Sequence, residues 1–367
     1  MESKSPFTTN QLQSQVISFL RFPLIVCVIL IHTQISSING VEGNMTNAHP
    51  FSGVYPFYEF VVYLIAQVFT RVAVPLFFFF SGFLFFYKSN DFSVQLFFRK
   101  LKKRVRTLLV PYLFWNIAFI LFYNLTKILF KGNSDDFIGT GYNLWDWMIT
   151  LWDYNNTGCP VSYQFWFIRD LMVVTIFAPL IHWLIKKIDY KILLVLGCLY
   201  FCGRWFKTPG FSIEAFFFYS LGAYFSITQR SFIDIVKPHT ALLGCLLIGM
   251  TILIMLTRSY EYVIYFKRLV IVIGMAFTIA LSATFIEIEK WKTNHFLSQS
   301  SFFVYAYHII ALPVIFKMLS LIPITSDIIA IIVYFLWAMI AILLGLVLYF
   351  VMTKWMPQTT KLITGGR

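Results

Sequence analysis

Residues 20–35 of the chain read LRFPLIVCVILIHTQI, an apolar segment typical of a membrane-spanning helix that nevertheless contains Arg21 and His32. The two residues are eleven positions apart, which is about three helical turns or roughly 16 Å, so both side chains share nearly the same face. Charged or titratable groups are unfavourable in hydrocarbon and usually face a protein interior or a wet cavity. The segment therefore predicts a polar track along the first membrane helix, with a permanent cation near one end and a proton acceptor deeper in.

The composition is that of a polytopic membrane protein. Of 367 residues, 59% are hydrophobic and only 12% charged, and the mean hydropathy is +0.75, whereas soluble domains are about a quarter charged. The formal charge of +13 is therefore interpreted through membrane topology, and no nucleic-acid partner is expected. The five cysteines lack the spacing of metal ligands, so no metal is expected.

Apolar segments of about the length that spans a bilayer follow one another along the whole chain. They are found at roughly 14–36, 57–87, 108–130, 164–186, 190–205, 211–227, 240–257, 262–286, 300–320 and 328–353.

Basic residues concentrate in the connections after even-numbered segments, and the largest group is RKLKKRVR at 99–106. The positive-inside rule then predicts that both ends, 1–13 and 354–367, are cytoplasmic and that 37–56 and 131–162 are external. The expected fold is a single all-α transmembrane domain over 1–367 with about ten helices.

Arg71 falls in the middle of the second segment, where its side chain cannot easily reach the membrane surface. Pro75, four residues later, should loosen the helix and release a carbonyl. Ser81 adds a small polar position beyond this point, whereas the phenylalanines at 77–80 are interpreted as packing or lipid-facing bulk. Arg71 and Ser81 are therefore candidate site residues.

The fourth segment opens with SYQFWFIRDLMVV, in which Trp166 precedes the neighbours Arg169 and Asp170. Adjacent helical positions point about 100° apart, so we expect that Arg169 and Asp170 do not simply neutralise each other. Anchoring at the outer interface and a functional role explain this group equally well.

The ninth segment carries Tyr305 and His308 three positions apart on one face. A single histidine on an apolar helix is more often a satisfied structural residue than a catalyst. The basic group at 99–106 has a general explanation in topology and in contact with anionic lipid. Arg104 and Arg106 are also candidates for binding a phosphorylated ligand, because the planar guanidinium matches phosphate.

Taken in order, these segments resemble the acyltransferase 3 family of integral membrane acyltransferases, which O-acylate extracytoplasmic glycans and other hydroxyl acceptors. Arg21 and His32 match its arginine–ten residues–histidine signature, and RVAVPLFFFFSGFLF at 71–85 matches its R-x-x-VP-x-FF-x-x-SGF block. Further matching segments are KKRVRTLLVPYLFW at 102–115, FWFIRDLMVV at 165–174, FYSLGAYF at 218–225 and SFFVYAYHII at 301–310.

The resemblance implies an acyl donor, usually acetyl-CoA, that enters from the cytoplasm, and a glycan or lipid-linked saccharide acceptor on the far side. It also implies a multi-pass protein of a bacterial inner membrane. Some members carry a fused extracytoplasmic hydrolase-like domain. We expect none here, so transfer would be completed within the membrane domain.

This framework gives the polar residues expected roles. Arg21, with Arg104 or Arg106, would meet the CoA phosphates, and neutral His32 would take the proton of the acceptor hydroxyl. The expected donors to the developing oxyanion are among Arg71, Trp166, Tyr305 and Arg169, and Ser81 and His308 are further candidate substrate-binding residues.

Two points of the mechanism stay open. The group that orients His32 is Glu59, Asp170 or a backbone carbonyl, and His32 either acts as a base or becomes acylated itself. The competing function is a secondary transporter, which intramembrane arginine and histidine also suit. The sequence shows no internal repeat and no carboxylate clearly in mid-membrane. A scaffold would leave Arg21, His32 and Arg71 unexplained.

Overall fold

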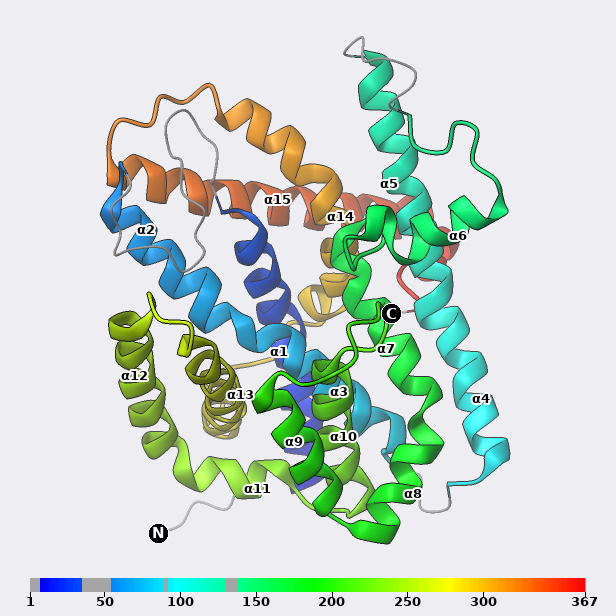
Figure 1. Ribbon diagram of the computed structural model, residues 1–367, viewed down its shortest axis with the longest axis vertical. Coiled ribbons are helices and arrows are strands. Elements are labelled where there is room, and N and C mark those ends of the chain that lie inside the picture. Colours follow the sequence, from blue (N-terminus) through cyan, green and yellow to red (C-terminus); the bar gives the residue numbers. More distant parts are fainter. Residues whose placement is uncertain (1–6, 35–53, 89–91, 130–136, 367) are drawn as a thin grey trace.

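The computed structural model describes residues 7–34, 54–88, 92–129 and 137–366, which form helices and loops and contain no strand (Figure 1). Short π and 3-10 turns interrupt several of the helices. The elements are, in chain order, α1 (Thr9–His32), α2 (Pro56–Val62), η1 (Tyr63–Phe69), η2 (Thr70–Val72), α3 (Ala73–Phe86), α4 (Val94–Arg104), η3 (Val105–Leu109), α5 (Val110–Leu129), α6 (Leu144–Trp152), η5 (Tyr154–Asn156), η6 (Tyr163–Phe165), α7 (Trp166–Ile176), α8 (Ala178–Ile188), α9 (Lys191–Cys202), α10 (Ile213–Ile227), α11 (Phe232–Val236), η7 (Lys237–His239), α12 (Thr240–Thr257), α13 (Val263–Glu287), α14 (His295–Leu319), α15 (Asp327–Trp355) and α16 (Pro357–Ile363).

In the described part of the chain, seven helical stretches are long and apolar enough to cross a membrane. The pair α7–α8, bent by 59°, is an eighth such stretch if it counts as one span, and α9 and α10 are shorter apolar helices. Together these elements coincide with the ten apolar segments predicted from the sequence. The protein is therefore an all-helical, multi-pass membrane protein. The number of crossings and the side of each terminus stay predictions.

The basic segment 99–106 lies within a helix. Ser93 caps the start of α4 by accepting a hydrogen bond from Leu96 N at 3.2 Å, and α4 continues through η3 into α5. Four of its basic residues, Arg99, Lys102, Lys103 and Arg106, are exposed. The connection expected after the second segment is therefore much shorter than the run of basic residues suggests.

The second stretch, from α2 to α3, is irregular just before Pro75. A wide π turn and a 3-10 turn displace the backbone ladder, and side chains bind the released carbonyls. Thr70 donates to the Ile65 carbonyl at 2.8 Å, and Arg71 Nε donates to the Ala66 carbonyl at 3.0 Å. Arg71 is thus held in place by the backbone of its own helix.

Helices α3 and α10 cross at two glycines. A Cβ atom on Gly82 would lie 2.0 Å from the Tyr219 carbonyl oxygen, and one on Gly222 would lie 1.9 Å from the Phe79 carbonyl oxygen. Only hydrogen fits at both positions, so the two backbones touch, as small residues permit between membrane helices. This crossing fixes the wall of the helix bundle that α3 provides.

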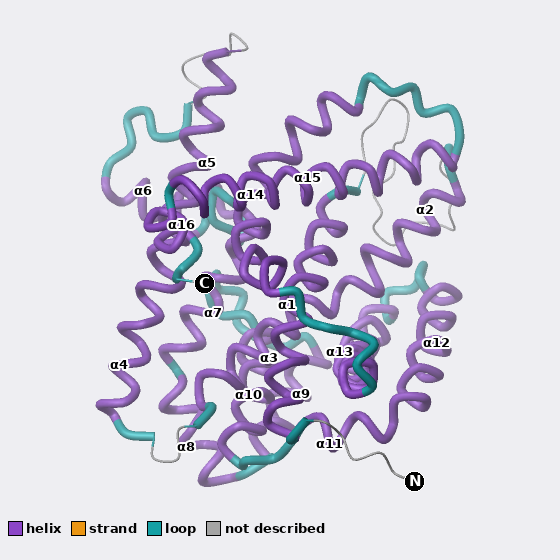
Figure 2. Tube along the Cα trace, turned by 180° about the vertical axis from the view of Figure 1, so that it is seen from behind, coloured by secondary structure: helices purple, strands orange, loops and turns teal. Residues whose placement is uncertain are grey.

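Helix α1 passes close to the centre of the molecule in both views (Figures 1 and 2). It contacts α3, α13, α14 and α15. Its first turn is fixed by a capping box between Thr8 and Gln11. The chain's C-terminal helix α16 packs on α5, where Trp115 Nε1 donates to the Ile363 carbonyl at 3.0 Å.

Candidate active site

Four of the predicted site residues line one cavity of about 200 Å³ beside α1: Arg21, Ser81, Arg104 and Tyr305. They come from α1, α3, α4 and α14, which are far apart in the sequence. We call this space the donor cavity. Because the bundle brings both arginines to one space, the arrangement offers two cations to an anionic group, as the sequence predicts for Arg21 and Arg104.

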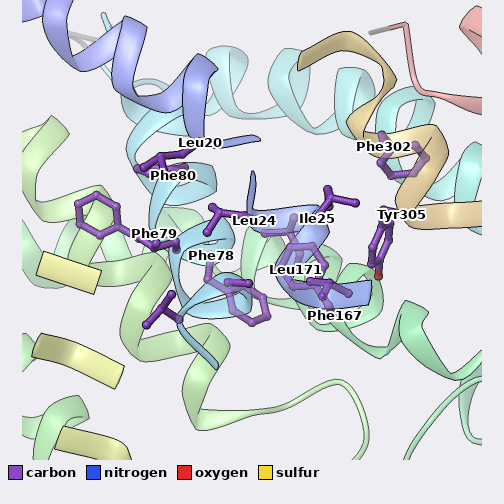
Figure 3. Packing of buried hydrophobic residues seen from close by; sticks show 14 of the residues in the cluster. Leu20, Leu24, Ile25, Phe78, Phe79, Phe80, Phe167, Leu171, Phe302 and Tyr305 are labelled. Atoms are coloured by element: carbon purple, nitrogen blue, oxygen red, sulfur yellow. The ribbon is translucent and has the colours of Figure 1, made fainter. Parts of the chain in front are cut away.

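The rest of the donor cavity is largely apolar. Figure 3 shows Ile25, Phe167, Phe302 and Tyr305 around this region. The Arg104 guanidinium lies 5.8 Å from the centre of the Phe85 ring, a cation–π distance that helps to hold it inside the bundle. A thin, weakly polar chain with a charged end matches these walls better than a sugar does, because a sugar needs many hydrogen-bond partners.

His32 lines a second cavity of about 280 Å³, which we call the histidine cavity. Tyr163 and Gln34 share this wall, and Trp337 of α15 is fixed there because its Nε1 donates to the Leu312 carbonyl at 3.0 Å. The Tyr163 hydroxyl lies 3.2 Å from His32 Nδ1. The described hydrogen-bond partner of His32 is therefore a phenol, instead of the carboxylate or carbonyl considered from the sequence.

His308 packs against the ring of His32. The two rings stack with centroids 5.4 Å apart and an angle of 28° between their planes, and His308 is fully buried. His308 Nδ1 donates to the Tyr305 carbonyl, and this bond leaves Nε2 as the unprotonated nitrogen. Nε2 is buried and has no hydrogen-bond partner among the described residues.

Tyr305 connects the two cavities. Its side chain lines the donor cavity and its hydroxyl donates to the Gln164 carbonyl at 2.6 Å. Its own carbonyl holds His308, which packs on His32. Tyr305, His308 and His32 thus form a continuous row of contacts between the donor cavity and the histidine cavity.

Arg71 reaches the histidine cavity through two glutamines. Its guanidinium donates to Gln67 Oε1 at 2.6 Å, and Gln67 Nε2 donates to Gln34 Oε1 at 3.4 Å. Gln34 in turn donates one amide hydrogen to the Ile31 carbonyl at 2.8 Å. Gln34 also lines the histidine cavity, so the charge of Arg71 acts there through a polarised amide.

The expectation for Arg169 and Asp170 is wrong. Arg169 folds back so that Nε and NH2 both donate to Asp170 Oδ1, at 3.0 and 2.9 Å, in a buried ion pair. Arg169 also donates to the Trp152 carbonyl at 2.6 Å. Side-chain flexibility outweighs the divergence of the two Cα–Cβ bonds, and the pair secures α7 to the end of α6.

Two other predicted residues lie apart from the two cavities. Arg106 is exposed in η3. Trp166 packs against Phe78, with ring centroids 6.5 Å apart, and lines neither of the two cavities. Within the described ranges, no group of three His, Cys, Asp or Glu side chains is close enough to hold a metal ion.

Sequence reasoning missed Tyr163, Gln34 and Gln67. A partial signal existed for the glutamines: Gln34 follows His32 by two positions, and Gln67 precedes Arg71 by one helical turn. No comparable signal existed for Tyr163, since it reaches His32 across 131 residues of sequence.

Comparison with known proteins identifies the family. Residues 15–354 match the acyltransferase 3 family model, described as an acyltransferase domain. The chain is also 28% identical over 150 residues to the succinoglycan biosynthesis protein ExoH of Rhizobium meliloti, an alignment that covers 40% of this chain and 39% of that relative. No solved structure matches. The chain therefore belongs to the acyltransferase 3 family of integral membrane acyltransferases.

Proposed function

We propose that the protein transfers an acetyl group from acetyl-CoA at the cytoplasmic face to a hydroxyl of an extracytoplasmic glycan or lipid-linked saccharide in a bacterial inner membrane. The observation that supports this most is the row of contacts from the donor cavity, with Arg21 and Arg104, to the histidine cavity, with His32. The relative named for succinoglycan biosynthesis supports a saccharide acceptor.

The donor is bound with its charged part near Arg21 and Arg104 and its pantetheine arm along the apolar wall. Arg21 and His32 are separated by roughly 16 Å along α1. An extended arm the length of about five residues spans roughly 16–18 Å. The thioester can therefore reach the neighbourhood of His32 while the phosphates stay near the arginines. Tyr305 and His308 pack between the two cavities, so the proposal requires their side chains to move aside as the arm passes.

The acceptor hydroxyl is activated by His32. In the tautomer that serves a base, Nδ1–H donates to the Tyr163 hydroxyl oxygen and Nε2 takes the acceptor proton. The acceptor oxygen attacks the thioester carbonyl, the C–S bond breaks, and the proton passes from His32 to the departing CoA thiolate. The amide of Gln34, polarised through Gln67 and Arg71, donates to the oxyanion and stabilises it.

The test is transfer of radiolabel from acetyl-CoA to surface glycan in membranes that express the protein, compared with membranes that lack it. Labelled glycan only in the former supports the proposal. Absence of labelled glycan, together with no thermal stabilisation of the purified protein by CoA, would reject it in favour of a transporter. Labelling from succinyl-CoA but not acetyl-CoA would keep the reaction type and correct the acyl group.

A further inference from the structure

A third cavity, of about 370 Å³, opens where the start of α1 meets the ends of α3, α8 and α10. We call it the basic cavity. Its lining includes Lys88, Lys186 and Arg230, together with His182, and no carboxylate from the described residues lines it. Figure 1 shows α8, α10 and α11 together at one end of the molecule. By the positive-inside rule this end is cytoplasmic.

The basic cavity also contains buried polar atoms that lack partners. Gln13 is only 4% exposed, and its Oε1 has no hydrogen-bond partner among the described residues. The Oγ atom of Ser226 is also buried and has no hydrogen-bond partner among the described residues. Both residues line the cavity. Buried polar atoms are nearly always satisfied. These two therefore indicate a polar ligand that can donate a hydrogen bond to the Gln13 oxygen, which a fully deprotonated anion such as sulfate cannot do.

Aromatic side chains complete the lining. Tyr87, Phe83 and Phe225 belong to the same wall, and the Lys88 ammonium lies 5.5 Å from the centre of the Tyr87 ring. Aromatic faces next to cations are suited to a molecule that combines a planar base with phosphate.

The basic cavity lies close to the donor cavity. A small space of about 50 Å³ between them shares Gln13 and Tyr87 with the basic cavity and shares Arg21 and Leu84 with the donor cavity. Gln13 and Arg21 are two turns apart on α1, or roughly 12 Å. A single elongated molecule can therefore occupy all three spaces in sequence.

We infer that the basic cavity binds the 3′-phosphorylated adenosine end of the acyl-CoA donor, an inference that rests on the proposed function. The cations of Lys88 and Lys186 meet the ribose phosphate, Gln13 and Ser226 bind the polar edge of the nucleoside, and the diphosphate lies towards Arg21. The sequence alone assigned phosphate binding to Arg21, Arg104 and Arg106, and this assignment adds a separate site for the nucleotide at Lys88 and Lys186.

An anionic lipid headgroup shares the phosphate chemistry. The nucleotide is favoured because a small space that shares residues with both cavities lies next to the basic cavity, on the side of the donor cavity. Aromatic side chains also line the basic cavity, and its unpartnered polar atoms suit a nucleobase or ribose.

The experiment compares the double variant Lys88→Gln/Lys186→Gln with the matched control Lys102→Gln/Lys103→Gln. All four lysines are exposed, so both variants lose two charges at little risk to folding. The Michaelis constants are measured for acetyl-CoA and for acetyl-pantetheine, which carries the same thioester without nucleotide or phosphate. The cavity variant should raise KM for acetyl-CoA about tenfold or more, because it loses charged phosphate contacts. It should leave kcat and KM for acetyl-pantetheine unchanged.

An equal KM for acetyl-CoA in both variants would overturn the assignment. A change in KM that the cavity variant shows for both thioesters, and only when anionic lipid is present, would also overturn it. That result would identify the ligand as a lipid headgroup. Binding of adenosine 3′,5′-bisphosphate to the purified protein separates this inference from the proposed function. If no acetyl transfer occurs, the nucleotide site is still supported when the bisphosphate binds the wild type and the control variant but binds the cavity variant more weakly. If the bisphosphate does not bind the wild type, the nucleotide site is rejected.

Discussion

Replacing Gly82 with alanine tests the crossing of α3 and α10. The added Cβ would lie 2.0 Å from the Tyr219 carbonyl oxygen, where ordinary contact begins at 3.4 Å. The difference means that the backbones must separate by about 1.4 Å, since neither can rotate away as a side chain would. Overpacking of a tight core costs about 3 kcal/mol at the upper end of its usual range. The better helix propensity of alanine returns about 1 kcal/mol. The free energy of unfolding of Gly82→Ala should therefore be lower than that of the wild type by about 2 kcal/mol.

Gly249→Ala in α12 is the matched control. It is also a helical glycine, but a Cβ there would meet nothing within 4 Å. This variant should gain up to about 1 kcal/mol from helix propensity alone. The assay is reversible unfolding of both purified variants by SDS in mixed micelles. If Gly82→Ala is as stable as Gly249→Ala, the close approach of the two backbones is wrong. Because Ser81, next to Gly82, lines the donor cavity, acetyl transfer should fall as well.

Three further predictions concern the site and the loop that contains Cys159. Tyr163→Phe removes the hydroxyl that lies 3.2 Å from His32 Nδ1. It should lower kcat about fivefold, as expected for one hydrogen bond of ~1 kcal/mol, and leave KM for acetyl-CoA unchanged. An unaltered kcat would exclude an orienting role for Tyr163. Gln67→Leu interrupts the connection from Arg71 and should lower kcat about tenfold or more, whereas a loss confined to KM would refute the relay. Burial raises the pKa of the Cys159 thiol. Its alkylation at pH 8 should therefore be slower than that of free cysteine, and the alkylation rate should still increase above pH 9. An alkylation rate that levels off by pH 8 would contradict this environment.

The apolar segments were the part of the fold that sequence could predict. Hydrocarbon requires long runs of apolar residues in helical form, so the ten ranges coincide with helices or bent helix pairs in the structure. Arg21 lines the donor cavity and His32 lines the separate histidine cavity, and the polar track that joins them stays a prediction.

The rest of the candidate site depends on tertiary structure. Tyr163 meets His32 because η6, just before α7, comes beside the end of α1, and no local pattern indicates this. Arg169 and Asp170 were misjudged because the angle between neighbouring Cβ atoms does not limit a long, flexible side chain. The basic cavity was equally hidden, since Lys88 and Lys186 are close only when separate helix ends meet.

The most direct test of the account is the first-turnover rate of acetyl transfer from acetyl-CoA by purified wild-type protein, His32→Ala and His308→Ala, with stability and acetyl-CoA affinity measured in parallel. Loss of a general base should slow His32→Ala at least about a hundredfold while acetyl-CoA still binds, because Arg21 and Arg104 remain. His308→Ala should be affected less. A His32→Ala rate within about threefold of the wild type, or a larger loss in His308→Ala, would contradict the assignment of His32 as the base.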